Sequence, residues 1–146
     1  MDAHLRPTKF DVQKTDKPWG YELLWAHNTH YAAKILHIMA NHALSLQVHR
    51  EKHETMCVLN GMVELEIHVD GHETRTVLNP GESFHIPAGV THRLSALITS
   101  DVLEASTPQL DDVVRLADDY GRAAVRGVVP GRAAEAAVET VRIATR

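Results

Sequence analysis

The sequence predicts an all-β domain, a jelly-roll sandwich or barrel, and three observations support this prediction. Short apolar or alternating runs fill the middle of the chain and are separated by turn residues at close intervals, as is typical of antiparallel strands. Within residues 63–69, apolar residues alternate with Glu and His, which gives a strand one buried and one wet face. Asn60-Gly61 and Asp70-Gly71 are dipeptides favoured in two-residue hairpin turns, where both residues need positive φ.

Eight strands are expected from this pattern, and their number and shortness suggest the jelly-roll arrangement. They are placed near residues 31–39, 43–49, 54–59, 62–69, 72–78, 83–87, 91–97 and 101–105. Pro80-Gly81 and Pro87-Ala88-Gly89 mark turns between the later strands. A further short strand over residues 21–25 is expected at the amino-terminal side.

Length, charge and cysteine content limit the kinds of protein this can be. A chain of 146 residues suits one domain with a substantial core. The formal net charge of −4 and the lack of a Lys/Arg-rich run disfavour a nucleic-acid surface. No early apolar stretch is long enough for a signal peptide or a membrane span, so we expect a cytoplasmic protein with no membrane partner. Cys57 lies in an apolar run and is interpreted as a packing residue.

The composition changes near the carboxyl end, where Asp, Arg and Ala become frequent from residue 110 onward. We expect the β-domain to occupy residues 1–122. Residues 123–146 are expected to form a tail that is disordered or contains a short helix over 132–145. This tail lacks bulky apolar anchors, which disfavours a helix lying on a membrane surface.

Two spaced sets of residues predict a metal site inside the barrel. They are Gln47-x-His49-x4-Glu54-x6-Gly61 and Gly81-x5-Pro87-x-Gly89-x2-His92. Gln47 and His49 are two residues apart, so on a strand they face the same side. Two imidazoles, a carboxylate and an amide oxygen suit a divalent transition metal such as Zn, Mn, Fe, Ni or Co. The expected ligands are Gln47, His49, Glu54 and His92. Glu51 and His53, in the same turn, are alternative ligands.

These two sets resemble the paired motifs of the cupin superfamily. The first family motif is Gly, five residues, His-x-His, four residues, Glu, six residues and Gly. This chain keeps that spacing with Asn41 in place of the first Gly and Gln47 in place of the first His. The second motif is matched except that Ala96 replaces its closing Asn. The resemblance implies a double-stranded β-helix barrel that binds metal. Since small cupins often pair their barrels, it also implies a homodimer.

Four further motifs follow one another along residues 17–122. They are Lys17-Pro18-Trp19-Gly20, Leu44-Ser45-Leu46-Gln47-x-His49, His92-Arg93-Leu94, and Asp111-Asp112-Val113-Val114-Arg115 with Asp118-x-Tyr120-Gly121-Arg122. Together they resemble the type II mannose-6-phosphate isomerase domain, the cupin often fused to mannose-1-phosphate guanylyltransferases. The resemblance implies that Gln at position 47 is normal for that branch and that the last pair of motifs forms an ordered strap. The chain departs from the branch at Arg50-Glu51-Lys52-His53 and at Met56, which bears on the substrate.

The resemblance implies aldose–ketose isomerisation of a sugar phosphate such as mannose 6-phosphate. The metal would hold the oxygens of an open-chain sugar and stabilise an enediolate. A base must lie within about 3 Å of the transferred proton. The candidate bases are Glu51, His53 and His85. The candidate cations for a phosphate are Lys52, Lys34 and Arg93. Trp19 and Tyr21 would either stack on a sugar or pack the amino-terminal strand.

Two other functions stay open from the sequence. With iron and open coordination positions, the same residues would support oxygen activation on a small organic substrate. Alternatively, the departures around residues 50–53 would suit a noncatalytic sugar-binding module. All three hypotheses share one kind of partner, a small molecule held at a metal.

Overall fold

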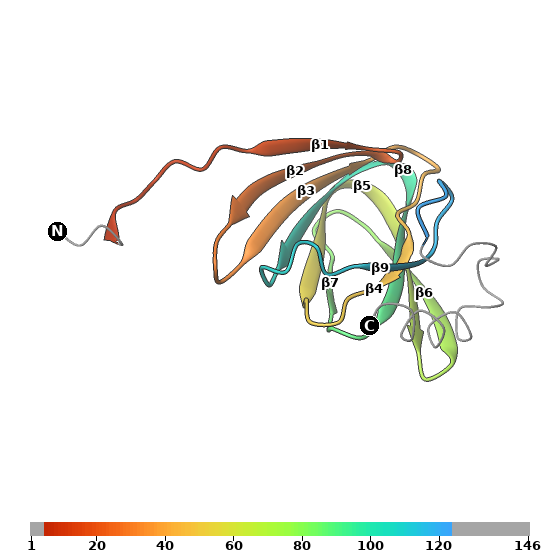
Figure 1. The fold of residues 1–146 in the computed structure, drawn as a ribbon. Coiled ribbons are helices and arrows are strands. Elements are labelled where there is room, and N and C mark those ends of the chain that lie inside the picture. Colours follow the sequence, from red (N-terminus) through yellow and green to blue (C-terminus); the bar gives the residue numbers. More distant parts are fainter. Residues whose placement is uncertain (1–4, 124–146) are drawn as a thin grey trace.

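The computed structural model of the chain describes residues 5–123, in which nine strands form one curled antiparallel sheet (Figure 1). The strands are β1 (Gln13–Lys17), β2 (Gly20–His27), β3 (Ala32–Ile38), β4 (Leu46–Val48), β5 (Glu54–Val69), β6 (His72–Leu78), β7 (Ser83–Ile86), β8 (Thr91–Ser106) and β9 (Val114–Ala117). The all-β prediction is confirmed. Within residues 5–123, no helix is long and apolar enough to cross a membrane.

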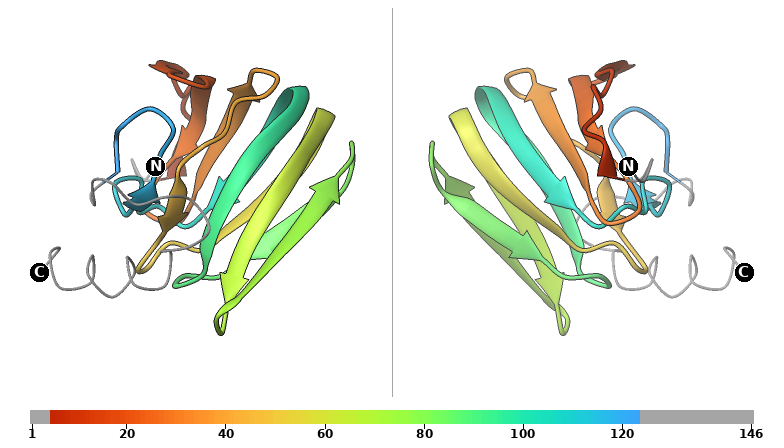
Figure 2. Two further views of the ribbon diagram at one scale, coloured as in Figure 1. Left: turned by 90° about the vertical axis from the view of Figure 1, so that its right-hand side faces the viewer. Right: turned by 90° about the vertical axis from the view of Figure 1, so that its left-hand side faces the viewer.

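Two long strands, β5 and β8, connect the two halves of the curled sheet. The strand order is β1-β2-β3-β8-β4-β9, and β5 pairs with β6, β7 and β8. β5 and β8 each contain 16 residues and run beside one another for most of their length. Figure 2 shows the resulting open half-barrel, with β1 to β3 on one side and β5 to β7 on the other.

The hairpin predicted at Asn60-Gly61 is wrong, because β5 continues through these residues. The pairing register between β5 and β8 shifts around Asn60 and Met62, which marks a bulge. Gly61 supplies the positive φ of 95° that the bulge needs. Side chains replace the missing ladder bonds: the Met62 N–H donates to Ser100 Oγ at 3.0 Å, and the Asp101 N–H donates to Asn60 Oδ1 at 3.2 Å. The strands predicted over residues 54–59 and 62–69 are therefore one bent strand, β5. Likewise, those predicted over 91–97 and 101–105 are one strand, β8.

Replacing Gly61 by Ala is expected to destabilise the fold by about 2–4 kcal/mol, measured by urea unfolding. A Cβ atom there would lie 2.1 Å from Ser100 Oγ and 2.6 Å from Ser100 Cα, so backbone must move. Gly81→Ala is the matched control, because Gly81 also has positive φ but no atom of residues 5–123 lies within 4 Å of its added Cβ. The free energy of unfolding of this control should fall by only about 1 kcal/mol. Equal losses in both variants would mean that close packing at the bulge contributes nothing.

Other strand predictions differ from the structure at their ends. Asp70-Gly71 forms the expected turn, with φ values of 50° and 76°. The strand predicted over residues 43–49 is shorter, because only Leu46–Val48 pairs continuously, with an isolated bridge between Ala43 and Ser95. β1 and β9 were not predicted as strands. The tail prediction for residues 123–146 and its helix over 132–145 lie outside the described residues, apart from residue 123.

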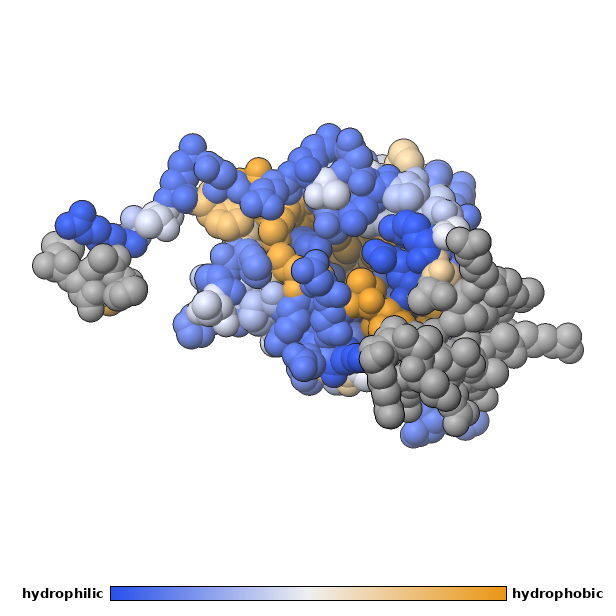
Figure 3. All heavy atoms as spheres, in the orientation of Figure 1, coloured by the Kyte–Doolittle hydropathy of each residue, from blue (hydrophilic) through white to orange (hydrophobic). Residues whose placement is uncertain are grey.

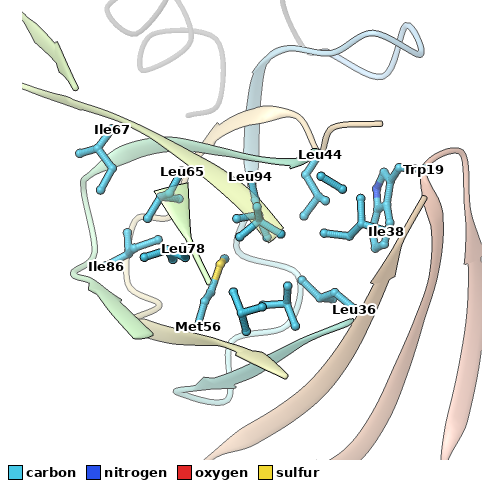
Figure 4. Close-up of a cluster of buried hydrophobic side chains, with 14 residues drawn as sticks. Trp19, Leu36, Ile38, Leu44, Met56, Leu65, Ile67, Leu78, Ile86 and Leu94 are labelled. Carbon is cyan, nitrogen blue, oxygen red and sulfur yellow. The ribbon is translucent and has the colours of Figure 1, made fainter. Parts of the chain in front are cut away.

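Apolar side chains fill the inside of the curl (Figure 4). Trp19 is 3% exposed and lies beside Ile38 at one end of this core, so its packing interpretation is supported. Tyr21 stacks on His37 with ring centroids 4.6 Å apart. Figure 3 shows hydrophilic residues over most of the visible described surface, with hydrophobic residues in a recess between β1 and β9. The core thus fixes the strands, while the recess leaves one side of the interior accessible.

Candidate metal centre

Three buried residues converge inside the curled sheet, and we call them the His–Glu–His cluster: His49, Glu54 and His92. His49 follows β4, Glu54 begins β5, and His92 lies on β8. One ligand atom from each lies within 4.8 Å of the others. The spacing predicted this convergence, and the strand register produces it, since Gln47 before His49 pairs with His92. His92 is fully buried and His49 is 3% exposed.

Backbone carbonyls orient both imidazoles. His49 Nδ1 lies 2.6 Å from the Asp112 carbonyl oxygen, and His92 Nδ1 lies 2.9 Å from the Val90 carbonyl oxygen. A carbonyl oxygen only accepts hydrogen bonds, so each Nδ1 carries a proton and donates it. In a neutral imidazole, this leaves the Nε2 atom as a lone-pair donor.

The Nε2 lone pairs then point at a third acceptor. Glu54 Oε1 lies 3.2 Å from His49 Nε2 and 2.8 Å from His92 Nε2. Three facing acceptors need a positive charge between them, supplied by protons on the imidazoles or by a metal ion. His92 Nε2 is buried and has no aligned hydrogen bond among the described residues. Two nitrogens and one carboxylate oxygen therefore fit a divalent transition metal.

Gln47 occupies the position expected of a fourth ligand. It faces the cavity that reaches His49, and its Oε1 atom accepts a hydrogen bond from Ser45 Oγ at 3.4 Å. Asn41, which replaces the first Gly of the cupin motif, has a φ of 62°. Asn tolerates this left-handed conformation better than most residues, so the substitution keeps the local geometry.

Lys52 is buried against the His–Glu–His cluster. Its Nζ atom lies 3.3 Å from Glu54 Oε2, and the residue is 6% exposed. Burial would lower the pKa of Lys52, but the charges of Glu104 and Glu54 outweigh it and raise the pKa. Burial would raise the pKa of Glu54, whereas hydrogen bonds with His49, His92 and Glu104 and the charge of Lys52 together hold it well below its usual range. Both groups are therefore charged at neutral pH.

Glu104 on β8 is a buried carboxyl that the sequence did not single out. It lines the same cavity as His49 and Lys52. Burial and the neighbouring Glu54 charge raise the pKa of Glu104 to about 8, although Lys52 opposes the shift. A group that titrates near neutral pH is suited to proton transfer.

Asp112 ties the turn after β4 to the segment before β9. Its carboxylate accepts the backbone N–H groups of Arg50, Glu51 and Lys52 at 3.0, 2.7 and 2.8 Å. Burial would raise the pKa of Asp112, but these hydrogen bonds outweigh it and lower the pKa. Because the Asp112 carbonyl also holds His49, one residue positions both the ligand and the turn. The strap predicted over residues 111–122 is thus ordered, with β9 inside it.

A cavity of roughly 580 Å³ lies beside the His–Glu–His cluster. Residues of β1, β2 and β3 form one wall, and residues of β4 and the β9 segment form the other. This is the recess visible between β1 and β9 in Figure 3. The volume is in the range of small-molecule sites.

The three candidate bases lie outside this cavity. Glu51 and His53 are exposed in the turn before β5. His85 is exposed on β7, where its ring stacks on His53 with centroids 6.3 Å apart. His85 pairs with Thr55, the neighbour of Glu54, and strand alternation turns it to the opposite face. A base acting inside the cavity must therefore be another residue.

The candidate phosphate-binding cations have different surroundings. Lys34 lines the cavity but pairs with Glu22 at 3.2 Å. Arg93 does not line the cavity, because it follows His92 on β8 and faces the other side of the sheet. Lys52 lines the cavity and is engaged by Glu54. The two that line the cavity, Lys34 and Lys52, each form an ion pair with a carboxylate, and Arg93 lies outside the cavity.

Comparison with known proteins agrees with this geometry. Residues 7–118 match the family model described as mannose-6-phosphate isomerase C-terminal. The chain is 35% identical over 112 residues to mannose-1-phosphate guanylyltransferase from Escherichia coli K12, which covers 73% of this chain. The match covers 22% of that relative's length, so the chain corresponds to about a fifth of it.

Solved structures with the same fold include KdgF from Halomonas sp., with a TM-score of 0.57, 25% identity, and coverage of 70% of this chain and 92% of that one. Oxalate decarboxylase from Bacillus subtilis has a TM-score of 0.66 at 15% identity, covering 73% of this chain and 30% of that one. CapF from Staphylococcus aureus has a TM-score of 0.64 at 15% identity, covering 75% and 35%. The chain therefore belongs to the mannose-6-phosphate isomerase C-terminal family and has the cupin fold.

Proposed function

We propose that this protein is a metal-dependent sugar-phosphate isomerase that interconverts an aldose and a ketose, with a mannose 6-phosphate-like substrate. The observation that carries the proposal is the convergence of His49 Nε2, His92 Nε2 and Glu54 Oε1 beside a small-molecule cavity. The family match supports sugar chemistry in particular. His49, His92, Glu54 and Gln47 are the proposed ligands. When bound, a divalent cation would polarise the carbonyl and neighbouring hydroxyl oxygens of an open-chain sugar.

The chain's own residues supply the proton transfer in this proposal. Glu104 lines the cavity, and its raised pKa lets it both accept and return a proton near neutral pH. His49, His92 and Glu104 hold Glu54 in its ionised form, and the charge of Lys52 adds to this effect. The Asp112 carbonyl keeps the lone pair of His49 pointed inward. The buried surroundings strengthen each of these interactions.

The proposal predicts exchange of the substrate's carbon-bound hydrogen with solvent. Metal-loaded protein incubated with mannose 6-phosphate in deuterium oxide should place deuterium at C2, detected by proton NMR. Glu104→Gln should reduce that exchange by roughly 10²- to 10⁴-fold, because a general acid–base catalyst is lost. Metal content should stay equal in the two proteins. The His85→Ala variant serves as the control, since His85 lies outside the cavity, and it should exchange normally.

A noncatalytic sugar-binding module is the second candidate, and one observation favours it. All three sequence-predicted bases lie outside the cavity. That function predicts sugar binding to the metal-loaded protein with no deuterium entry at C2, in the wild-type protein and in Glu104→Gln alike. The same NMR experiment therefore separates the two functions.

A further inference from the structure

Cations lie on both walls of the cavity: Lys17 and Lys34 on the wall of β1 to β3, and Arg115 and Arg122 on the wall of the β9 segment. Lys17 and Lys34 share the carboxylate of Glu22, at 3.8 and 3.2 Å. A single carboxylate cannot neutralise two ammonium groups. The wall of β1 to β3 therefore retains positive charge.

The wall of the β9 segment retains positive charge as well. Arg122 forms a two-pronged pair with Asp118, with Nε and Nη2 each 2.9 Å from one of its two oxygens. The side chain of Arg115 makes no hydrogen bond or ion pair with any residue in the part of the chain that the structure describes. The ion pairs of these cations thus use two carboxylates, Glu22 and Asp118, while Asp111 and Glu104 also line the cavity. The whole chain has a net charge of −4.

The surroundings of Arg115 are unfavourable for a cation without a partner. It is half-buried at the cavity. Burial lowers the pKa of Arg115, and the nearby Arg122 charge lowers it further, while Asp118 and Glu22 offset part of the effect. A partly desolvated guanidinium with free donors is suited to bind a phosphate or carboxylate with two parallel hydrogen bonds.

The strand register places Arg115 at a defined distance from the His–Glu–His cluster. Arg115 on β9 pairs with Gln47 on β4, and Gln47 pairs with His92 on β8. Two strand spacings therefore separate the backbones of Arg115 and His92, about 10 Å. Arg115, Gln47 and His49 line the same cavity. A six-carbon chain can extend between a metal at the cluster and a guanidinium on β9.

We propose that Arg115 binds the terminal anionic group of a sugar whose oxygens at the other end lie at the His–Glu–His cluster. This inference rests on the proposed function and specifies the substrate class: a sugar that ends in a phosphate or a carboxylate. Lys34 and Arg122 add long-range attraction, while Arg115 supplies the direct contact. Neutral sugars lack the group that this contact recognises.

Isothermal titration of the metal-loaded protein with mannose 6-phosphate, mannuronate and mannose tests the inference. The wild-type protein should bind at least one of the two anionic sugars about 10- to 100-fold more tightly than mannose. The Arg115→Gln variant should lose this difference, with affinity for mannose unchanged. Arg115→Lys should recover part of it, because Lys retains the charge without the fork. If Arg115→Gln weakens the binding of mannose 6-phosphate alone, Arg115 recognises a phosphate. If it weakens the binding of mannuronate alone, Arg115 recognises a carboxylate.

Arg75→Gln is the matched control. Arg75 lies away from the cavity and pairs with Glu64, Glu66 and Glu73, so its loss should leave the affinity for all three sugars unchanged. Metal content and unfolding midpoint are measured for every variant. Equal affinity of the wild-type protein for mannose and both anionic sugars would overturn the inference, as would unchanged anion affinity in folded Arg115→Gln. Arg115-dependent binding without deuterium exchange would sustain the inference and reject isomerisation.

Discussion

Replacing His49 or His92 by Ala is expected to abolish stoichiometric binding of a divalent transition metal. Each change removes one of the two Nε2 atoms that face Glu54 Oε1. We expect affinity to fall by more than about 100-fold, because even partners that only orient a ligand contribute roughly 10- to 100-fold. Metal per chain is measured by mass spectrometry after dialysis against a zinc or manganese buffer.

The control for these two variants is His85→Ala. His85 is an exposed histidine on β7, so its loss should leave the metal content at the wild-type level. Full occupancy in folded His49→Ala and in folded His92→Ala would remove the site. In the wild-type protein, occupancy should also decline as pH falls, because imidazole must be neutral to ligate.

Replacing Lys52 by Met is expected to destabilise the metal-free protein by about 3–5 kcal/mol. The change leaves Glu54, which is 2% exposed, without the ammonium group 3.3 Å from its Oε2 atom. Because the fold raises the pKa of Lys52, its contribution is fully present below the unfolded-state pKa of about 10.4 and is lost as pH rises through the folded-state pKa. Urea unfolding at pH 7 in a chelator therefore measures the full effect.

Urea unfolding of the wild-type protein and Lys52→Met in the presence of metal shows whether an ion binds at Glu54. A bound cation would compensate the Glu54 carboxylate, so Lys52→Met should cost less in the metal-loaded protein than in the metal-free protein. Lys14→Met is the control, since Lys14 is exposed and its pair with Asp16 is 3.9 Å long; it should change stability by no more than about 0.5 kcal/mol. An equal Lys52→Met loss in both states would mean that no cation lies at Glu54.

The sequence predicted the centre of this site because residue spacing and strand alternation are local rules. Gln47 and His49 are two residues apart on one strand, and turn residues return the chain so that Glu54 and His92 can reach the same point. The family resemblance gave the same residues and is confirmed by the family match. Glu104 could have been found from the sequence. It is two residues after Val102 on a predicted strand, so both side chains face the same side, and an apolar Val102 indicates that this side is the interior.

The features that the sequence did not predict depend on contacts between residues far apart in the chain. Asn60-Gly61 has the composition of a hairpin turn, yet Ser100 from β8 bonds to Met62 in place of the regular ladder, and β5 is continuous. Glu51 and His53, proposed as bases, lie in a turn whose backbone is held by Asp112, sixty-one residues after Glu51, and they do not line the cavity. The position of Arg115 opposite Gln47 arises from a pairing between β4 and β9 that no local pattern indicated.

The central claim is that His49, Glu54 and His92 hold a metal ion at the inner end of the cavity. An anomalous difference map from crystals grown with manganese or zinc, collected on both sides of the metal's absorption edge, tests it most directly. We predict one strong peak within bonding distance of His49 Nε2, His92 Nε2 and a Glu54 oxygen, about 2.0–2.2 Å if the ion is zinc. A map from metal-saturated crystals with no peak there, or with its peak only at other residues, would contradict the claim.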